Sequence, residues 1–309
     1  MHTDVSKPRI RPVMVGVNGS RSGPALVDLA AAEAARYSAP LLIVHVWPGR
    51  YTGAYRGRGA VASRADAQRL LDLLTSRARL AAPRLRVRAE LLDGNAANLL
   101  TETSARAQLL VVGHRDEAYG RPAWGSTTAY LSFHSACPTL VYSGSVPADG
   151  PVVVTTSARP EGDGTLGYAF ERASLVGAPL VAVHMWTRPG AEDGPPVAVP
   201  KGAYAEERAA AEQSLSAALG KWVARFPDVT VEQLIVNDFD IAFTVERALR
   251  RGRLLVAGIG RGGSFAELLC SARQSHAGLR ANSPIVLVPP GWSGRDEDTS
   301  VASARVARS

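Results

Sequence analysis

Cysteine is almost absent from this 309-residue chain, which has only Cys137 and Cys270. Two cysteines build neither a disulfide framework nor a zinc site, so both are interpreted as ordinary thiols. Long apolar runs are absent as well: no stretch of about 18 apolar residues occurs, which excludes a transmembrane helix. Residues 1–17 hold no long apolar signal core and no small-residue cleavage site, which predicts a cytoplasmic protein.

Catalytic motifs are equally scarce. The chain contains no G-x-x-x-x-G-K-[ST], no G-x-S-x-G and no H-E-x-x-H. GIGRGG at 258–263 matches the dinucleotide fingerprint, but it follows the fourth strand of its half and lacks the acidic residue expected about 20 positions later. A nucleotide hydrolase or an oxidoreductase would need a catalytic constellation that the sequence does not offer, so we expect a non-catalytic protein.

The net positive charge of the chain is confined to its first half. Residues 1–150 hold 18 Lys and Arg against 11 Asp and Glu, whereas residues 151–309 hold 17 of each. Arginines cluster at 50–64 and 77–88, where a nucleic-acid binder would use them. The clusters lack the interleaved aromatic residues of a base-stacking platform, so solvated surfaces are favoured and nucleic acid is not the expected partner.

The chain contains an internal duplication. Ala39-Pro40-Leu41 recurs as Ala178-Pro179-Leu180, and His45-Val46-Trp47 recurs as His184-Met185-Trp186, both offset by 139 residues. LLVVGH at 109–114 and CPTLVY at 137–142 have counterparts in the same order, at 254–259 and 283–288. Several separated blocks recurring in one order predict two copies of one domain, joined near 143–151.

Each half alternates short apolar runs with helical periodicity. Continuous apolar strands separated by helices predict an α/β fold, with a parallel sheet covered by helices on both faces. We therefore expect two tandem doubly wound domains of five strands each, at 11–146 and 147–290, with a mobile N-terminal tail at 1–10 and a disordered C-terminal tail at 291–309. The predicted strands span 12–17, 41–47, 86–92, 109–113, 138–143, 152–156, 180–186, 229–236, 254–259 and 284–289.

Two helices show an apolar face. The first is predicted from Leu70, Leu73, Leu74, Ala78 and Ala81, and the second from Leu215, Leu219, Val223 and Phe226. A third helix, at 95–107, has Asn95 as its expected N-cap.

Ligands in such sheets bind beyond the carboxyl ends of the strands, where the strand order reverses. Asn18-Gly19-Ser20, His45 to Trp47 and the loop that follows Gly113 all lie at strand ends, so we expect them to converge on one crevice. For His45 and His184, a packed strand histidine bonded to the backbone is favoured over a ligand-lining role.

Taken together, the blocks VGVNGS (15–20), APLLIVHVW (39–47), VVGHR (111–115) and Cys137-Pro138 resemble the universal stress protein family in its tandem form. The resemblance covers nearly the whole chain outside the tails and the loops at 48–62 and 187–203. It implies strand order 3-2-1-4-5, cytoplasmic location, a stress-linked regulatory role, and a homodimer or an intramolecular pairing of domains through the last strands. Some members of the family bind ATP or AMP and others bind no nucleotide.

The family's nucleotide signature is Gly, two residues, Gly, nine residues, Gly, then Ser or Thr. Its backbone N–H groups point at phosphate oxygens. This chain keeps Gly113 and the pair Gly125-Ser126, but it has Asp116 in place of the second Gly and is one residue short. Asn18 stands where nucleotide-binding members commonly carry aspartate. In the second half the departures are larger, with Ser157, Arg261, Ser271 and Ala272 at the corresponding positions.

The resemblance implies one adenine-nucleotide site in the first domain, for ATP or AMP with or without Mg²⁺, and a degenerate site in the second. Phosphates would contact the glycine loop, ribose would lie near Asn18, and adenine would rest against Val17 and Val46. Three alternatives stay open: a family member that binds only proteins, a weak ATP hydrolase, and a nucleic-acid binder. The candidate binding residues are Val17, Asn18, Gly19, Ser20, Val46, Gly113, His114, Arg115, Gly125, Ser126 and Thr127.

Overall fold

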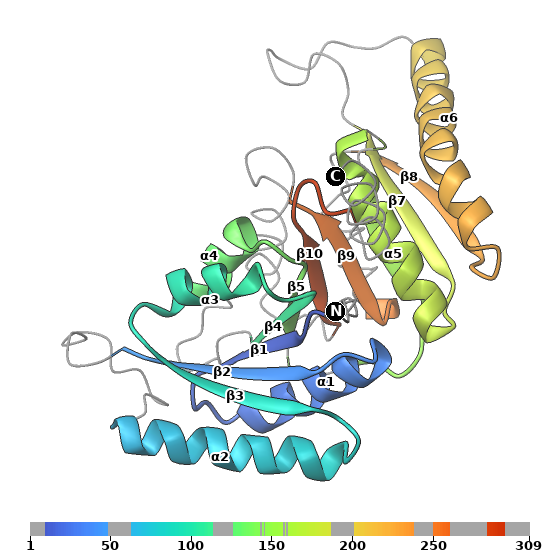
Figure 1. Ribbon diagram of the computed structural model, residues 1–309. Helices are drawn as coiled ribbons and strands as arrows, with labels where there is room; N and C mark the ends of the chain where they lie inside the picture. The colour runs from blue at the N-terminus through green and yellow to red at the C-terminus, as the bar shows by residue number, and fades with distance from the viewer. Residues whose placement is uncertain are drawn as a thin grey trace, which may run out of the picture. The chain divides into compact units, whose positions relative to one another are not determined.

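The computed structural model of the chain (Figure 1) describes residues 10–48, 63–113, 126–142, 144, 146–156, 158, 160–186, 201–237, 250–259 and 283–293. The described chain packs as two units: the first ends at Gly144, and the second continues to Trp292. The exact domain bounds given by the sequence stay a prediction. The tails at 1–9 and 294–309 lie outside the described residues.

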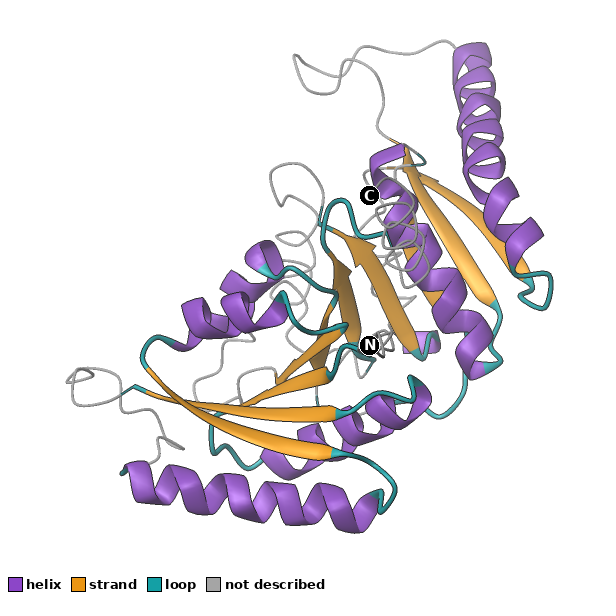
Figure 2. Ribbon diagram, viewed as in Figure 1, coloured by secondary structure: helices purple, strands orange, loops and turns teal. Residues whose placement is uncertain are grey.

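The first unit is a five-stranded sheet in the order β3-β2-β1-β4-β5, in which every neighbouring pair is parallel. Helices α1 and α2 cover one face and α3 and α4 the other (Figures 1 and 2). The elements are β1 (Val13–Val17), α1 (Gly23–Arg36), β2 (Leu41–Trp47), α2 (Arg64–Ala81), β3 (Val87–Asp93), α3 (Ala96–Ser104), β4 (Leu109–Gly113), α4 (Ser126–His134) and β5 (Thr139–Tyr142).

The second unit repeats this sheet in the order β10-β9-β6-β7-β8, again with parallel pairs. The α/β class with two doubly wound, five-stranded parallel sheets is therefore confirmed. Its described elements are β6 (Val152–Thr156), η2 (Pro160–Gly162), α5 (Asp163–Val176), β7 (Leu180–Trp186), α6 (Lys201–Arg225), β8 (Val231–Asn237), β9 (Leu254–Gly258) and β10 (Ile285–Val288).

The predicted helix faces are correct in part. On α2 the buried stripe is Ala67, Leu71, Leu74, Thr75 and Ala78, whereas Leu73 is 67% exposed and Ala81 is also exposed. On α6, Leu215 and Leu219 are buried as expected, but Val223 is 44% exposed. Residues three or four apart share a helix face. Leu73 and Val223 were assigned to the wrong face, and each is next in sequence to a residue of the face that packs. The predicted cap is confirmed, because Asn95 Oδ1 accepts a hydrogen bond from the backbone nitrogen of Asn98.

Packing of α6 on α5 depends on Trp222, which sequence periodicity did not single out. Its ring stacks with Phe170 and Phe226, and its indole nitrogen donates to Asp163 at 2.8 Å. The ring lies so close to α5 that a Cβ at Gly167 would overlap it. Glycine at 167 is therefore required by helix–helix contact, since it has no side chain to obstruct the indole.

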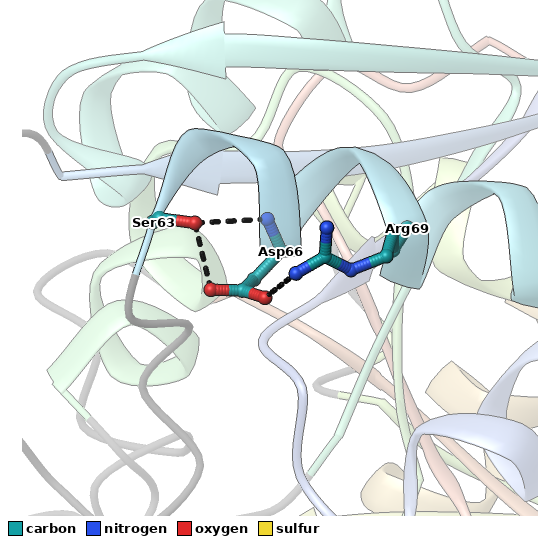
Figure 3. Close-up of polar contacts among 3 residues, drawn as sticks. All are labelled: Ser63, Asp66 and Arg69. Atoms are coloured by element: carbon teal, nitrogen blue, oxygen red, sulfur yellow. Dashed lines mark hydrogen bonds and ion pairs between the residues drawn. The ribbon is translucent and has the colours of Figure 1, made fainter.

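Ser63 is the N-cap of helix α2. The Ser63 hydroxyl accepts a hydrogen bond from the backbone nitrogen of Asp66 at 3.1 Å and donates to the Asp66 carboxylate at 2.7 Å (Figure 3). The other carboxylate oxygen of Asp66 pairs with Arg69. The Ser63 hydroxyl, with a contribution from Arg69, holds the pKa of Asp66 below its ordinary value of 3.8. The start of α2 is thus fixed by a side-chain cap.

We expect the substitution Gly167→Ala to lower the free energy of unfolding by about 1–3 kcal/mol, the usual cost of forcing an extra group into a packed contact. The matched control is Gly220→Ala on α6, where a Cβ would meet nothing within 4 Å. That change removes a helical glycine and should raise stability by about 0.5–1 kcal/mol. Urea unfolding followed by tryptophan fluorescence measures both, and equal effects would contradict the contact.

The substitution Ser63→Ala should raise the pKa of Asp66 toward 3.8, as measured by carboxyl NMR titration. Because the folded-state pKa is depressed, this interaction stabilises the fold above the ordinary pKa and is lost as pH falls through the folded value. The stability difference between wild type and variant should therefore narrow in acid. Ser76→Ala, which removes an exposed hydroxyl from the middle of α2, should leave Asp66 unchanged.

Candidate functional site

The carboxyl ends of β1, β2 and β4 lie at the same edge of the first sheet. Val17 pairs in register with His45, and Gly16 pairs with Val112, so Val17 stands next to Gly113 across the β1–β4 boundary. From this boundary, successive strands of the chain are added to the sheet outward in opposite directions. Doubly wound sheets bind their ligands at such a point. Of the predicted site residues, the structure thus brings the β1 loop, the end of β2 and Gly113 to one edge.

The loop after β1 is a tight turn held by its own side chains. Asn18 Oδ1 accepts a hydrogen bond from the Ser20 backbone nitrogen at 3.1 Å, and the Ser20 and Ser22 hydroxyls lie 3.0 Å apart. Gly19 has φ +76°, a conformation that favours glycine. The bond within the turn uses one lone pair of the Asn18 oxygen, so the exposed side chain can offer a ligand its two N–H donors and one remaining acceptor position.

The end of β2 is anchored to the end of β1 through a histidine. His45 is 4% exposed, and its Nδ1 lies 2.7 Å from the Val17 carbonyl oxygen. A carbonyl only accepts, so Nδ1 carries the hydrogen; Nε2 is buried and has no hydrogen-bond partner in the structure as described. The backbone-bonded histidine predicted from the sequence is confirmed. His184 makes the same contact in the second unit, 3.0 Å from the Thr156 carbonyl oxygen.

The end of β4 is tied to α4 by a residue that sequence reasoning did not select. The Thr128 hydroxyl donates to the Gly113 carbonyl oxygen at 3.1 Å, and Thr128 is 6% exposed. The segment 114–125, with His114, Arg115 and Gly125, lies outside the described residues. Ser126 and Thr127 open α4, so they lie two residues and one residue before Thr128, whose side chain contacts Gly113. The sequence could have pointed to Thr128, because it is a hydroxyl residue in the first turn of the helix that follows the glycine loop.

The two glycines that end β4 and β9 differ in what packing demands of them. A Cβ at Gly113 would lie 3.6 Å from a methyl of Leu26, an ordinary van der Waals contact. A Cβ at Gly258 would lie 2.7 Å from the Thr165 hydroxyl oxygen, which is closer than real Cβ contacts allow. Packing therefore explains glycine at 258 and gives no reason for glycine at 113.

The second unit shares two features with the first loop at the residues that the structure describes: a positive φ two residues after the central strand and a side chain that accepts from the backbone there. Ala158 has φ +55°, close to the conformation of Gly19, and its backbone nitrogen donates to the Thr156 hydroxyl at 3.1 Å. The N-terminus of α5 is covered by the chain itself, because a Cβ at Gly164 would overlap the Trp292 carbonyl. Ser157 and the residues at 260–282, which include the altered signature positions, lie outside the described residues.

Other chemistry is limited in the part of the chain that the structure describes. No group of three or more His, Cys, Asp or Glu residues is placed there to hold a metal ion. Burial raises the pKa of the Cys137 thiol to about 12, so it stays protonated and unreactive at neutral pH. Among the same residues, no helix is both long enough and apolar enough to cross a membrane.

Comparison with known proteins places this arrangement in a family. The sequence pattern of the universal stress protein family matches residues 9–143. A universal stress protein of Mycobacterium bovis is 30% identical over 305 residues, which cover 92% of this chain and 99% of that protein. The chain therefore belongs to the universal stress protein family, and the resemblance seen in its sequence is confirmed.

Solved structures agree with the fold. A universal stress protein from Archaeoglobus fulgidus superposes with a TM-score of 0.63 at 15% identity, covering 90% of this chain and 96% of that one. Two shorter universal stress proteins, solved in complex with cAMP and with dAMP, each match 43% of this chain with a TM-score of 0.34, at 26% and 20% identity. Their ligands belong to those proteins and do not by themselves assign one here.

The difference between the two glycines can be measured. Gly113→Ala should change the free energy of unfolding by no more than about 0.5 kcal/mol, whereas Gly258→Ala should lower it by about 1–3 kcal/mol. Urea unfolding gives both values. Adding Gly258→Ala to a Thr165→Ala background should cost less than adding it to wild type, because the opposing hydroxyl is gone. Equal costs in the two backgrounds would contradict the contact with Thr165.

Proposed function

We propose that this universal stress protein is a non-catalytic, stress-linked regulatory protein that binds one adenine nucleotide in its first domain. The ligand is ATP or AMP, with or without Mg²⁺. The observation that carries the proposal is the glycine at the end of β4: packing against Leu26 does not require it, whereas close approach of a phosphate to the backbone does.

The nucleotide would be held by three segments. Its phosphates would lie on the backbone of Gly113, His114, Arg115 and Gly125 and on the hydroxyls of Ser126 and Thr127, at the start of α4. Backbone N–H groups at a helix N-terminus favour anions. Thr127 is the better side-chain donor in this turn, since Thr128 donates to Gly113 instead. The arginine would offset the carboxylates that follow it in the loop.

The nucleoside would lie across the ends of β1 and β2. Adenine would rest against Val17 and Val46, which are 6% and 9% exposed at the sheet edge. The ribose would contact the turn formed by Asn18, Gly19 and Ser20. Because the Asn18 oxygen accepts from Ser20, the amide nitrogen would donate to a ribose oxygen, a weaker contact than an aspartate accepting from both hydroxyls.

The second domain would bind no nucleotide. Packing alone accounts for Gly258, and the Trp292 carbonyl covers the α5 N-terminus. The two domains would then have different roles, with the first responding to nucleotide and the second supplying structure or a surface for partners. Cytoplasmic location, and either a homodimer or an intramolecular pairing of domains through the last strands, belong to the same proposal and rest on the family resemblance.

A family member that acts only through protein contacts is the second candidate. The internal use of the Asn18 oxygen favours it, because the carboxylate acceptor typical of nucleotide-binding members is absent. Weak ATP hydrolysis is the less favoured alternative, since the sequence offers no catalytic motif and the His45 imidazole, whose Nε2 has no hydrogen-bond partner in the described structure, is only 4% exposed.

Nucleotide content and affinity test the proposal. Protein purified without added ligand, denatured and run on ion-exchange HPLC should release about one adenine nucleotide per chain, or should bind ATP at one site by calorimetry. Thr127→Val should weaken ATP binding by about 10–100-fold, the loss of one hydrogen bond to a charged group. The double change Gly125→Ala with Ser126→Ala should abolish it.

The matched control is Ser271→Ala, at the corresponding signature position of the second domain, which should leave stoichiometry and affinity unchanged. No co-purified nucleotide together with no heat up to millimolar ATP would refute the nucleotide proposal and favour the protein-binding candidate.

A further inference from the structure

Two side chains bond the backbone carbonyls that end adjacent strands of the first domain. His45, on β2, donates from Nδ1 to the carbonyl of Val17, the last residue of β1. Thr128, on α4, donates from its hydroxyl to the carbonyl of Gly113, the last residue of β4. Val17 and Gly113 follow directly on the pair Gly16 and Val112, so the two carbonyls lie on neighbouring strands. Neighbouring strands of a sheet are about 4.8 Å apart.

Each bond joins two separate parts of the sheet edge at which the nucleotide is proposed to bind. The His45 bond joins β2 to β1, and these strand ends carry Val46 and Val17, where adenine would rest. The Thr128 bond joins the first turn of α4 to β4, and these carry Thr127 and Gly113, where phosphate would lie. Both donors are at least nine-tenths buried, so their geometry is set by packing and does not depend on solvent.

The Thr128 bond also changes the electrostatics of the rim. A strand-end carbonyl oxygen carries partial negative charge, and a phosphate beside it would be repelled. When the Thr128 hydroxyl donates a hydrogen bond to the Gly113 carbonyl oxygen, it partly neutralises the negative charge of that oxygen. The N–H groups at the start of α4 then remain as the groups that face an anion.

We propose that His45 and Thr128 are positioning residues of the nucleotide site, Thr128 for the phosphate half and His45 for the nucleoside half. The inference deepens the proposed function and rests on it. It divides the site into two parts that respond to different features of the ligand. A purely structural role of Thr128 would weaken ATP and adenosine alike, and a purely structural role of His45 would lower the melting temperature while both dissociation constants of the folded protein stay unchanged.

The internal duplication supplies a matched control. His184 makes the same contact to Thr156 in the second domain, at 3.0 Å, and is 7% exposed. Removing either imidazole deletes the same buried bond, but only His45 lies in the proposed site. His184→Leu therefore reports the structural cost of the change without the ligand.

The experiment measures dissociation constants for ATP and for adenosine by calorimetry, on full-length protein. Thr128→Val keeps the shape and removes the donor; it should raise the ATP constant about tenfold while the adenosine constant stays within about twofold. Thr128→Ser restores the hydroxyl and should restore ATP binding. His45→Leu should raise both constants by the same factor, and His45→Asn, whose Nδ2 takes the place of Nδ1, should recover most of the loss. His184→Leu should change neither.

Thermal unfolding of each variant separates loss of binding from loss of fold. If His45→Leu does not fold, the pair Thr128→Val and Thr128→Ser still decides the phosphate half, and His45→Phe, which keeps a planar ring without a donor, is compared with His45→Asn to decide the nucleoside half. Equal effects of Thr128→Val on ATP and adenosine, or none on either, would overturn the inference while nucleotide binding stands. A wild-type protein that binds neither ligand would overturn the proposed function and this inference with it.

Discussion

Parallel pairing of β1 with β2 on one side and with β4 on the other is the constraint on which the candidate site depends. In this arrangement every strand ends at the same edge, so residues that are 28 and 96 positions from Val17 along the chain meet beside it. At this edge the strand-end carbonyls need hydrogen-bond donors from side chains. The His45 imidazole donates to the last carbonyl of β1, and the Thr128 hydroxyl donates to the last carbonyl of β4. Backbone topology thus dictates which side-chain donors the edge needs.

The two copies of the domain show which features belong to the fold and which are free to change. The histidine bond to the central strand occurs in both copies, as does a left-handed residue two positions after that strand's last residue. These features serve the sheet edge itself. The first copy fills the left-handed position with Gly19 and stabilises the turn with an Asn18 side chain, whereas the second uses Ala158 and the Thr156 hydroxyl. Both positions have a positive φ, but the side chains that bond the backbone there differ.

Strands were predictable from the sequence because their apolar runs are continuous and buried. Four of the strands, β2, β4, β6 and β7, match the predicted ranges at both ends. Helix faces were less predictable: Leu73 and Val223 are apolar yet exposed, and only contact with a neighbouring element decides which of two adjacent positions faces the core. Thr128 and Trp222 could not be assigned for a related reason. Their roles depend on the Gly113 carbonyl and the Asp163 carboxylate, which lie 15 and 59 residues away in sequence. Hydrophobic periodicity does not identify such distant partners.

The contact between Thr165 and Gly258 has a consequence for how this chain can diverge. Selection for a stable second domain retains glycine at 258 even if no ligand ever binds there, since any side chain would meet the hydroxyl. A glycine of the family signature can therefore be retained for packing alone, without any bound ligand. At position 113 packing imposes no such restriction, and drift to alanine would cost the fold little. In descendants of this protein, a change at 113 would mark the loss of nucleotide binding if the proposed function holds, while an intact 258 would mark nothing beyond the integrity of the domain.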